Sequence, residues 1–421
     1  MQILGRSELG RRRFMVAAGH GLAAAAALGR QGQPEGAGGT HPSKPENSAK
    51  GDKTQKPKEG KNPAVGKPAS KTDAAQGGKT TVPGVEDRKV GIAIVGIGKL
   101  TVGEIMPAFA QCIKCEPVAL VSGDRDKARA VAAAYGVDEG AVYDYDGYDA
   151  IRDNPAIDAV YIVLPNSMHR EHTERAAAAG KHVLCEKPMA TTSADCRAMI
   201  AVCERAKRRL MIAYRCHYEP YNLKMMEWGK ERKYGKPSLI VSDTVMDVGG
   251  KGQWRLDRAL NGDGSLFDIG IYSLNAARYL TGEEPSEVSA MMYSDPKDAR
   301  FKEIEQSIAF QLRFPSGAIA NCTSSYGTGT VNRYRVIGTE GFYGLEPATK
   351  YRGLECWHGT LEKTERLHLE EVNQFAAEMD HFAECVLGDK EPRTGGAEGL
   401  KDVALIEKIY EAAKGGRAVK G

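Results

Sequence analysis

Lys187, Asp268 and Tyr272 are residues whose types suit proton transfer to and from an alcohol. Asp268 and Tyr272 stand four residues apart in a helical pattern, so one turn of helix can place both side chains in the same pocket. Removing a hydride from an alcohol carbon requires a base for the hydroxyl proton, and the reverse reaction requires an acid at the same place. The set could therefore support the oxidation of an alcohol and the reduction of a carbonyl group.

Lys187 belongs to one of two polar segments that each follow a predicted buried strand. The apolar run 159–164 is followed by Pro-Asn-Ser-Met-His at 165–169, and the run 182–185 leads into Glu-Lys-Pro at 186–188. In an open parallel sheet, ligands bind at the carboxyl ends of the strands. Both segments are therefore candidates for one binding site.

The start of the predicted fold has the pattern of a dinucleotide-binding unit. The run Val90–Val95 is short, almost wholly apolar and rich in β-branched residues, as expected of a buried parallel strand, and Gly-Ile-Gly at 96–98 precedes a helical pattern. Gly96 permits the tight turn, and Gly98 lets the backbone approach a pyrophosphate at the positive end of the helix. Thr101 stands at the third glycine position, so the fingerprint is incomplete.

The end of the second predicted strand, 117–122, indicates which dinucleotide is bound. A carboxylate there would hold a ribose diol and favour NAD, but the strand ends in Ser122, with Arg125 and Lys127 beyond it. A hydroxyl and cations suit a 2′-phosphate, so we predict NADP. Asp124 could repel that phosphate, which keeps NAD as the alternative.

Strands and helices then alternate as far as residue 213. Further strands are expected at 141–143, 159–164, 182–185 and 210–213, and helices at 125–135, 148–153, 169–179 and 193–206. This repetition predicts a parallel sheet with right-handed connections. The fold class is therefore α/β, with an N-terminal Rossmann dinucleotide-binding domain over residues 88–213.

Residues 214–421 are predicted to form an α+β domain built on a large, mostly antiparallel sheet. Strand-like runs, several of them alternating apolar and polar residues, lie at 238–247, 287–293, 306–314, 318–325 and 333–337. A turn at 314–318 joins two of them as a hairpin. Helices are expected at 264–280, 374–387 and 397–413, the last two returning to the nucleotide domain.

From about residue 88 to its end the chain resembles the Gfo/Idh/MocA family of oxidoreductases. The Glu-Lys-Pro and Pro-Asn-x-x-His segments described above carry the resemblance. Segments 214–218 (Tyr-Arg-Cys-His-Tyr), 253–255 (Gln-Trp-Arg), 264–272 (Gly-Ser-Leu-Phe-Asp-Ile-Gly-Ile-Tyr) and 278–285 make the chain most similar to the glucose–fructose oxidoreductase subgroup.

The resemblance implies a role for each reactive side chain. Many family members have a histidine four residues after the aspartate of an Asp-x-Gly-x-His motif, and Tyr272 stands at that position here. Tyr272 is thus the implied acid and base, Asp268 the orienting carboxylate, and Lys187 the donor to substrate and ribose. Because a free tyrosine titrates near pH 10, about three units above neutral, a cation should stabilise its phenolate, and Lys187 is the candidate. Pro188 is implied to be cis.

The same resemblance extends to cofactor and sugar contacts. The implied cofactor contacts are Gly96, Gly98, Lys99, Leu100, Ser122, Lys127, Pro165, Asn166, His169, Glu186, Lys187 and Arg215. The sugar contacts are Tyr218, Trp254 and Arg255, since arginine and aromatic residues suit hydroxyl groups and apolar sugar faces, although packing explains Trp254 nearly as well. Taken singly, Lys187 could be a surface charge, Asp268 an ordinary helix residue and Tyr272 a core aromatic.

The first residues have the pattern of an export signal. Arg-Arg-Arg-Phe-Met at 11–15 precedes a short, weakly apolar run that ends at Leu28, as in a twin-arginine signal peptide over 1–29. An uncleaved amphipathic N-terminus is the alternative. Residues 30–87 are rich in Gly, Pro, Ser and Lys, which predicts a flexible arm, or one that packs on a neighbouring subunit.

Composition limits the remaining classes of function. The chain has 421 residues and a formal net charge of +3, with much of its lysine before residue 88, so neither nucleic-acid binding nor a membrane-surface role is expected. Nine scattered cysteines fit buried thiols better than disulfides. Cys112 and Cys115 form a CxxC without a second one, so we expect no metal.

The export signal and the dinucleotide fold together predict a reaction cycle in which the bound cofactor is regenerated on the enzyme. The periplasm supplies essentially no free NADP, so an exported enzyme must carry its cofactor in and regenerate it there. The resemblance to the glucose–fructose oxidoreductase subgroup implies the sugars: an aldose such as glucose is oxidised to its lactone and a ketose such as fructose is reduced to a polyol, by a ping-pong mechanism. It also implies a homo-oligomer, a dimer or tetramer, in which residues 214–421 bind substrate and support oligomerisation. The alternatives are a sugar dehydrogenase with dissociable NAD(P) and a non-catalytic dinucleotide-binding sensor.

Overall fold

The computed structural model describes residues 88–360 and 362–421. The predicted signal peptide (1–29) and the predicted arm (30–87) lie outside the described residues. None of the helices in the described part of the chain has the length and apolar character needed to cross a membrane.

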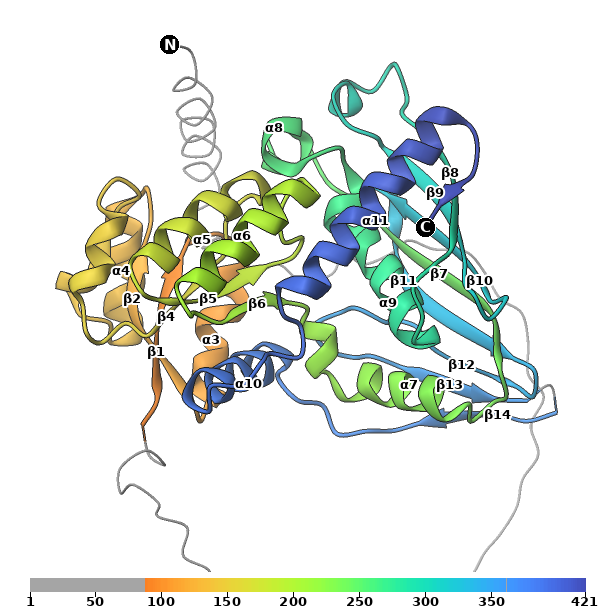
Figure 1. Cartoon of the computed structure of the whole chain (residues 1–421), viewed down its shortest axis with the longest axis horizontal. Helices are drawn as coiled ribbons and strands as arrows, with labels where there is room; N and C mark the ends of the chain where they lie inside the picture. The colour runs from red at the N-terminus through yellow and green to blue at the C-terminus, as the bar shows by residue number, and fades with distance from the viewer. Residues whose placement is uncertain (1–87, 361) are drawn as a thin grey trace, which may run out of the picture. The chain divides into compact units, whose positions relative to one another are not determined.

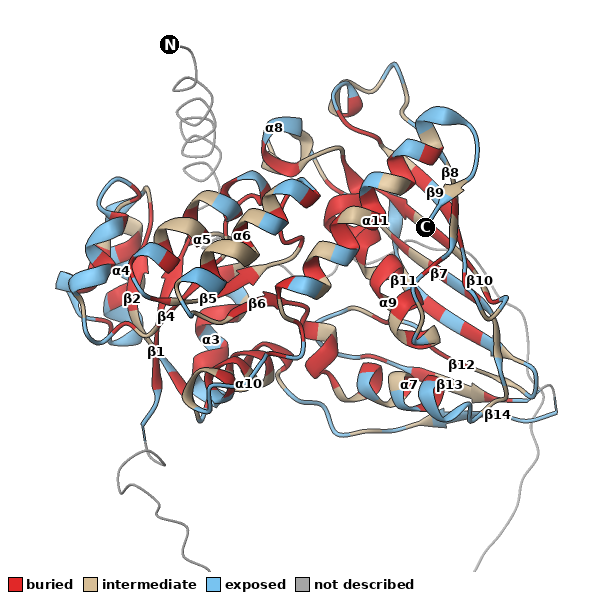
Figure 2. Cartoon of the chain, in the orientation of Figure 1, coloured by how far each residue is buried: buried red, intermediate tan, exposed pale blue. Residues whose placement is uncertain are grey.

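A six-stranded parallel sheet forms the first half of the described chain (Figure 1). Its spatial order is β3-β2-β1-β4-β5-β6, which confirms the predicted Rossmann domain with a parallel sheet. Strands β1, β4 and β6 are buried along their whole length, as Figure 2 shows for the centre of this sheet. The strands are β1 (Val90–Val95), β2 (Cys115–Val121), β3 (Val142–Tyr143), β4 (Ala159–Ile162), β5 (His182–Glu186) and β6 (Leu210–Ala213).

Helices connect and cover this sheet. The first connection is not a regular α-helix: a π-helical turn, Thr101–Ile105, leads into the short α3 (Met106–Ala108) and a 3₁₀ turn, Phe109–Gln111. The later connections are α4 (Arg125–Tyr135), a 3₁₀ segment (Tyr148–Asp153), α5 (His169–Ala178) and α6 (Ser193–Arg205). These positions agree closely with the predicted ones.

The second sheet has nine strands in the order β14-β13-β12-β11-β7-β10-β9-β8-β15. Most neighbours are antiparallel, as predicted, and the turn 314–318 makes the β9–β10 hairpin. The β7–β10 pair is parallel, however, because a long excursion separates these two strands in the sequence. The strands are β7 (Pro237–Asp247), β8 (Glu287–Tyr293), β9 (Ser307–Arg313), β10 (Ile319–Ser325), β11 (Gly327–Gly338), β12 (Phe342–Leu345), β13 (Cys356–Gly359), β14 (Thr364–Leu367) and β15 (Val419–Lys420).

One face of the second sheet is covered by α9 (Ile271–Thr281) and α11 (Gly396–Gly415), whereas α10 (Gln374–Leu387) returns to the first sheet beside β1 and β2. The other face exposes apolar side chains, among them Leu239, Val241, Met291, Tyr293 and Ile337. Along β9 and along residues 333–337 of β11, buried and exposed residues alternate, which is the pattern of a sheet with one covered face (Figure 2).

Several elements of the second half were not predicted. Helices α7 (Pro220–Glu231) and α8 (Arg258–Asn261) were missed, as were strands β12, β13 and β14. The strands are four residues long, too short to show a period, and β14 is largely exposed. The predicted helix 264–280 begins instead with a π-helical turn, Leu266–Gly270, before α9. All nine cysteines are free and eight of them are buried, as expected.

Candidate active site

The turn after β1 depends on Gly96. This residue has a φ of +98°, and a Cβ atom there would lie 2.3 Å from the carbonyl oxygen of Val163, which follows β4. Thr101, at the third glycine position, is buried and donates a 2.6 Å hydrogen bond from Oγ1 to the Gly96 carbonyl oxygen. The incomplete fingerprint therefore still makes a tight turn, because a threonine hydroxyl holds it.

Gly98 is a glycine for a different reason. A Cβ atom there would meet no atom within 4 Å, so the space in front of this residue is open. A helical segment begins just beyond it, at Thr101, and the first N–H groups of a helix favour an anion in front of them. Lys99 is exposed and Leu100 half-buried at the same turn. This part of the structure fits a bound pyrophosphate.

The end of β2 offers a hydroxyl and a cation. Ser122 is buried, and its Oγ accepts a hydrogen bond from the Asp124 amide. The carboxylate of Asp124 caps α4 by accepting from the Lys127 amide at 3.0 Å, so it already has a partner. The Lys127 side chain is half-buried, and burial lowers its pKa. Ser122 and Lys127 thus suit a phosphate, and their chemistry fits the predicted NADP.

The segment after β4 connects the two halves of the site. Pro165 opens it, and the buried Asn166 donates from Nδ2 to the Asn261 carbonyl oxygen at 2.8 Å and to Asn261 Oδ1 at 3.0 Å. The ring nitrogens of His169, which is fully buried, lie 2.9 Å from the carbonyl oxygens of Leu164 and Pro188. Both side chains were predicted to contact the cofactor; their positions favour holding the strand ends together.

The side chains of Glu186 and Lys187, at the end of β5, contact different partners. Glu186 accepts a 2.8 Å hydrogen bond from the Tyr161 hydroxyl, and burial raises its pKa although Lys187 opposes the effect. Lys187 Nζ donates to the Asp268 carbonyl oxygen at 2.6 Å and to Asp268 Oδ1 at 3.2 Å. The peptide bond between Lys187 and Pro188 is cis, as the resemblance implied.

Asp268 is the centre of a dense set of charges. Its Oδ1 receives Lys187, and its Oδ2 accepts from Arg255 Nε at 2.7 Å and from the Tyr326 hydroxyl at 2.8 Å. Burial acts to raise the pKa of Asp268, but the cations Arg255 and Lys187 outweigh burial and hold it well below the ordinary range. Asp268 is therefore a fixed carboxylate at neutral pH, suited to orienting its neighbours.

Tyr272 lies between two cations. Lys187 Nζ is 4.7 Å from the centre of the Tyr272 ring, whereas Arg215 Nη2 donates a 3.0 Å hydrogen bond to the Tyr272 hydroxyl oxygen. Lys187, Asp268 and Tyr272 are thus brought together as predicted. Arg215, which was predicted as a cofactor contact, donates to the Tyr272 hydroxyl and also, at 2.6 Å, to Gln374 Oε1 and the Thr349 carbonyl oxygen.

The three predicted sugar contacts fall in different places. Trp254 is half-buried, and the Arg255 guanidinium carbon lies 4.6 Å from its ring centre, so both are at the rim of the Asp268 cluster. Tyr218 is buried, and its hydroxyl lies 3.1 Å from Thr394 Oγ1. Tyr218 is not part of the cluster around Tyr272, and its position favours packing over a sugar contact.

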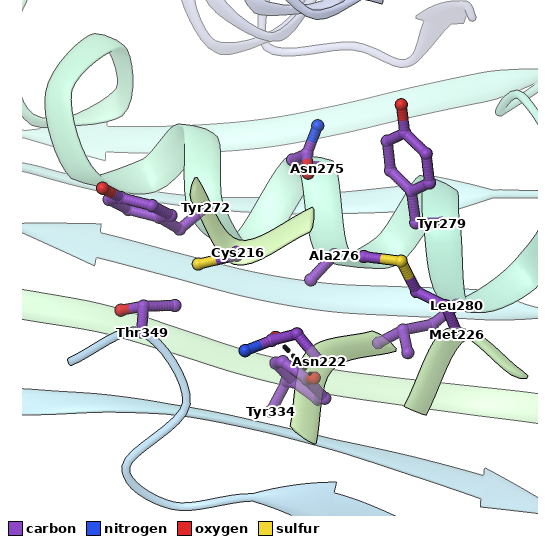
Figure 3. A pocket seen from close by; sticks show the side chains of 10 residues that line it. All are labelled: Cys216, Asn222, Met226, Tyr272, Asn275, Ala276, Tyr279, Leu280, Tyr334 and Thr349. Carbon is purple, nitrogen blue, oxygen red and sulfur yellow. Dashed lines mark hydrogen bonds between the residues drawn. The ribbon is translucent and has the colours of Figure 1, made fainter. Parts of the chain in front are cut away.

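A small pocket, mostly apolar in its lining, lies beneath Tyr272 (Figure 3). Tyr272 stands at one end of it, beside Cys216 and Thr349, and Tyr279 stands at the other end. Tyr279 was interpreted as a core aromatic, and the edge-to-face contact of its ring with His217, at 3.9 Å between ring centres and 79° between ring planes, agrees.

Three residues that hold the cluster were missed at the sequence level. Tyr326 reaches Asp268 from the end of β10. Asn261 donates to the Arg255 and Gly264 carbonyl oxygens. Glu305 accepts from the Leu266 amide at 2.8 Å, at the start of the helix that carries Asp268 and Tyr272. No local pattern marks them, because Tyr326 and Glu305 act on residues 58 and 39 positions away, and Asn261 also receives Asn166 from 95 positions away.

The cluster has the parts that proton transfer at a sugar carbon requires. A tyrosine hydroxyl faces a guanidinium, an ammonium lies over its ring, and a buried carboxylate fixes that ammonium. All of them stand at the carboxyl edge of the parallel sheet, where the open space at Gly98 also lies. The arrangement can transfer a proton beside a bound dinucleotide.

The comparison with protein families agrees with this geometry. Residues 90–214 match the model described as an oxidoreductase family with an NAD-binding Rossmann fold. Residues 223–343 match the GFO/IDH/MocA C-terminal domain. The two matches cover the parallel sheet and much of the second sheet.

Individual relatives are sugar oxidoreductases by name. The chain is 36% identical over 337 residues to D-xylose 1-dehydrogenase [NADP(+)] of Haloarcula marismortui. The aligned region covers 78% of this chain and 92% of that protein. It is 49% identical to aldose-aldose oxidoreductase from Caulobacter crescentus, solved with glycerol, with a TM-score of 0.78 over 79% of this chain and all of that one. A 3-ketoreductase from Actinomadura kijaniata shares the fold, with a TM-score of 0.70 at 22% identity.

Proposed function

Because the chain belongs to the Gfo/Idh/MocA family of oxidoreductases, we propose that it is an NADP-dependent sugar oxidoreductase that keeps its cofactor bound through the whole cycle. In one half of the cycle an aldose such as glucose is oxidised to its lactone. In the other half a ketose such as fructose is reduced to a polyol at the same site. The two halves together make a ping-pong reaction between sugars.

NADP, when bound, supplies a reversible acceptor for the hydride of a sugar carbon. The residues that would hold it are Gly96 and Gly98 at the pyrophosphate and Ser122 and Lys127 at the 2′-phosphate. The support for this assignment is the open space at Gly98 and the half-buried ammonium of Lys127, described above.

Tyr272 carries the proton in both directions. As a phenolate its hydroxyl oxygen accepts the proton of the aldose C1 hydroxyl while the hydride leaves C1, which gives the lactone. As a phenol it returns that proton to the carbonyl oxygen of the second sugar while the hydride arrives at the carbonyl carbon, which gives the alcohol. The proton balance of the enzyme is then restored. Asp268 holds Lys187 in place during both steps.

The observation that carries the proposal is the environment of the Tyr272 hydroxyl. It receives a guanidinium N–H at 3.0 Å, and a lysine that a buried carboxylate fixes lies over the Tyr272 ring, 4.7 Å from its centre. Fixed donors aimed at an oxygen that gains negative charge are the arrangement that stabilises such a charge. A non-catalytic sensor would have no use for it.

A second aldose as the acceptor sugar is the alternative that one observation favours. The relative that is 49% identical is an aldose-aldose oxidoreductase. The NADP-dependent xylose dehydrogenase, at 36% identity, favours the further alternative of a cofactor that leaves after each turnover. The following experiment distinguishes the three.

The test is to purify the protein without added nucleotide, denature a portion and identify any released dinucleotide by chromatography. Glucose is then added to the intact protein while the absorbance of the reduced nicotinamide is followed, and afterwards fructose or a second aldose is added. The proposal expects stoichiometric NADP that glucose reduces and fructose reoxidises. Reoxidation by the aldose alone would assign the aldose pair. An empty protein that needs added NADP would overturn the closed cycle.

The periplasm is the proposed location, with export of the folded protein by the twin-arginine route. The support is the Arg-Arg-Arg-Phe-Met segment at 11–15, together with a cofactor that must be loaded before export. Fractionation of expressing cells should find the mature protein in the periplasm. Replacing Arg11, Arg12 and Arg13 by lysine should leave it in the cytoplasm, and an unchanged distribution would contradict the route.

A homo-oligomer, dimer or tetramer, is the proposed assembly. The support is the uncovered face of the second sheet, where Met291 and Tyr293 are 77% and 61% exposed. Light scattering after size exclusion should give a multiple of the monomer mass. Introducing a charge at Tyr293 should lower that mass if this face joins the subunits.

A further inference from the structure

The two cations beside Tyr272 differ in whether a carboxylate already neutralises them. Lys187 is paired with Asp268, to which it donates twice. Arg215 donates to Gln374 Oε1 and the Thr349 carbonyl oxygen, each at 2.6 Å, to the Tyr272 hydroxyl at 3.0 Å and to the Cys216 sulfur at 3.8 Å, none of which is a carboxylate. Within 88–360 and 362–421, no carboxylate forms an ion pair with Arg215.

The charge of Arg215 is also well shielded from water. Arg215 is 6% exposed, and its guanidinium carbon lies 4.6 Å from the ring centre of Tyr351, 5.1 Å from that of Tyr272 and 5.9 Å from that of Phe375. A charge surrounded by rings is screened weakly, so it acts strongly on the nearest group that can become negative. That group is the Tyr272 hydroxyl.

Two acids lie near Arg215, and within the described residues neither forms an ion pair with it. Glu186 and Glu378 are both close enough to Arg215 to feel it, and burial raises the pKa of each, that of Glu378 far above its usual range. Glu378 is fully buried, and neither of its carboxyl oxygens has a hydrogen-bond partner in the described structure, which favours its neutral form.

We propose that Arg215, and not Lys187, is the cation that stabilises the deprotonated hydroxyl of Tyr272. The inference rests on the proposed function, in which Tyr272 is the acid and base. Lys187 is left to hold Asp268 and to bind substrate and ribose. The sequence-level expectation that Lys187 stabilises the phenolate is thereby replaced.

The hydrogen bond also determines where the Tyr272 proton points. Because Arg215 donates to the hydroxyl oxygen, the hydroxyl hydrogen of the neutral tyrosine must point away from Arg215. The guanidinium itself keeps its protons, since arginine does not titrate in proteins. Arg215 therefore stabilises the charge and orients the hydroxyl, while the proton is exchanged with the sugar alone.

The first test compares Arg215→Gln with Lys187→Met in single-turnover reduction of the bound cofactor by glucose. Loss of a donor to a developing oxyanion costs about 100-fold or more in rate. We expect Arg215→Gln to lose about that much at pH 7, and to recover most of it near pH 10, where tyrosine ionises without help. Lys187→Met should lose rate at both pH values. The inference is overturned if Arg215→Gln shows no recovery at high pH or if only Lys187→Met shows it.

The second test does not depend on turnover. The ultraviolet tyrosinate band is recorded at about pH 8.5, below the pH at which an unassisted tyrosine ionises, for the wild type and for Tyr272→Phe, and the difference is the contribution of Tyr272. That contribution should shrink several-fold in Arg215→Gln and change little in Lys187→Met. The reverse order would overturn the inference. If Tyr272→Phe still turned over, the proposed function would fail, whereas this measurement would still decide which cation acts on Tyr272.

Chemical rescue keeps the test independent of misfolding. Arg215→Ala should leave a space beside Tyr272 that free guanidinium at low concentration can enter. Guanidinium should then raise the rate of this variant by about tenfold. Arg393→Gln is the matched control, because that guanidinium lies 5.2 Å from the ring centre of Tyr218, away from Tyr272. It should keep the wild-type rate and gain nothing from guanidinium. Failure of Arg215→Ala to respond, while it remains folded and keeps its dinucleotide, contradicts the inference.

Discussion

The cofactor edge of the parallel sheet and the cluster around Asp268 are built in different ways. At the edge, the turn after β1 depends on backbone: Gly96 passes close to Val163, and Gly98 leaves space for a ligand. The cluster depends on side chains from distant segments, since Lys187, Arg255 and Tyr326 all converge on Asp268. A backbone site tolerates changes that preserve its path, whereas a side-chain site should fail when one partner is lost.

Among the variants that test this difference, Tyr272→Phe should lower the reaction rate most. The ring stays in place and the hydroxyl is lost, so proton transfer at the sugar should fall by about 1,000-fold. Bound dinucleotide should stay stoichiometric, because the cofactor edge is untouched. Single-turnover kinetics with glucose, alongside chromatography of the released nucleotide, measures both. Loss of the nucleotide would show that the two regions are not separable.

Asp268→Asn tests the cluster as an electrostatic unit. Removing one partner of a buried ion pair costs about 3–5 kcal/mol, here because Lys187 and Arg255 lose their counter-charge. The folded-state pKa of Asp268 is depressed, so its stabilisation is present above the unfolded pKa of about 4 and is lost as the pH falls below it. Denaturant unfolding at pH 7 and pH 3 should therefore show a smaller difference between variant and wild type at pH 3. An equal difference at both pH values would contradict this.

Gly96→Ala and Gly98→Ala form a matched pair at the cofactor edge. The first places a Cβ 2.3 Å from a carbonyl oxygen at a φ of +98°, so it should lower the free energy of unfolding by about 2 kcal/mol or more. The second meets no atom within 4 Å, so its stability without nucleotide should change little. Gly98→Ala should instead weaken dinucleotide binding, which calorimetry measures. Equal loss of stability in both would refute the distinction.

Lys127→Ala should shift cofactor preference by about tenfold from NADP toward NAD, through loss of a charge-assisted bond to a phosphate. The ratio of dissociation constants of apoprotein for the two dinucleotides is the measurement. Arg129→Ala on the same helix is the control, because Arg129 is already paired with Asp126 and Glu139. If both variants shift alike, general charge rather than Lys127 sets the preference.

Tyr326→Phe should have the smallest effect of the set. Asp268 Oδ2 keeps its 2.7 Å bond from Arg255, so the carboxylate loses one of its partners only. The rate of sugar oxidation should fall about threefold, as expected for one net hydrogen bond, and the cofactor content should not change. A loss as large as that of Asp268→Asn would make Tyr326 essential to the cluster.

The cofactor edge could be predicted from the sequence because its signals are local. A β-branched run, a glycine turn and a serine followed by cations lie within about 40 residues, and periodicity placed the strands to within one or two residues. The cluster was predicted only in part. Lys187 and Asp268 were matched through family motifs, but the pairing of Arg215 with Tyr272 needs residues 57 apart to meet, which periodicity does not show. Tyr326 and Asn261 were missed for the same reason.

Transfer of deuterium between sugars is the measurement that tests the closed cycle most directly. The protein as purified is given glucose labelled with deuterium at C1, together with fructose and an excess of free unlabelled NADP, and the polyol and free nucleotide are analysed by mass spectrometry. The account predicts one deuterium in each polyol molecule and none in the free nucleotide pool. Deuterium in the free pool, with a correspondingly unlabelled polyol, would contradict it and identify a dehydrogenase whose cofactor leaves after each turnover.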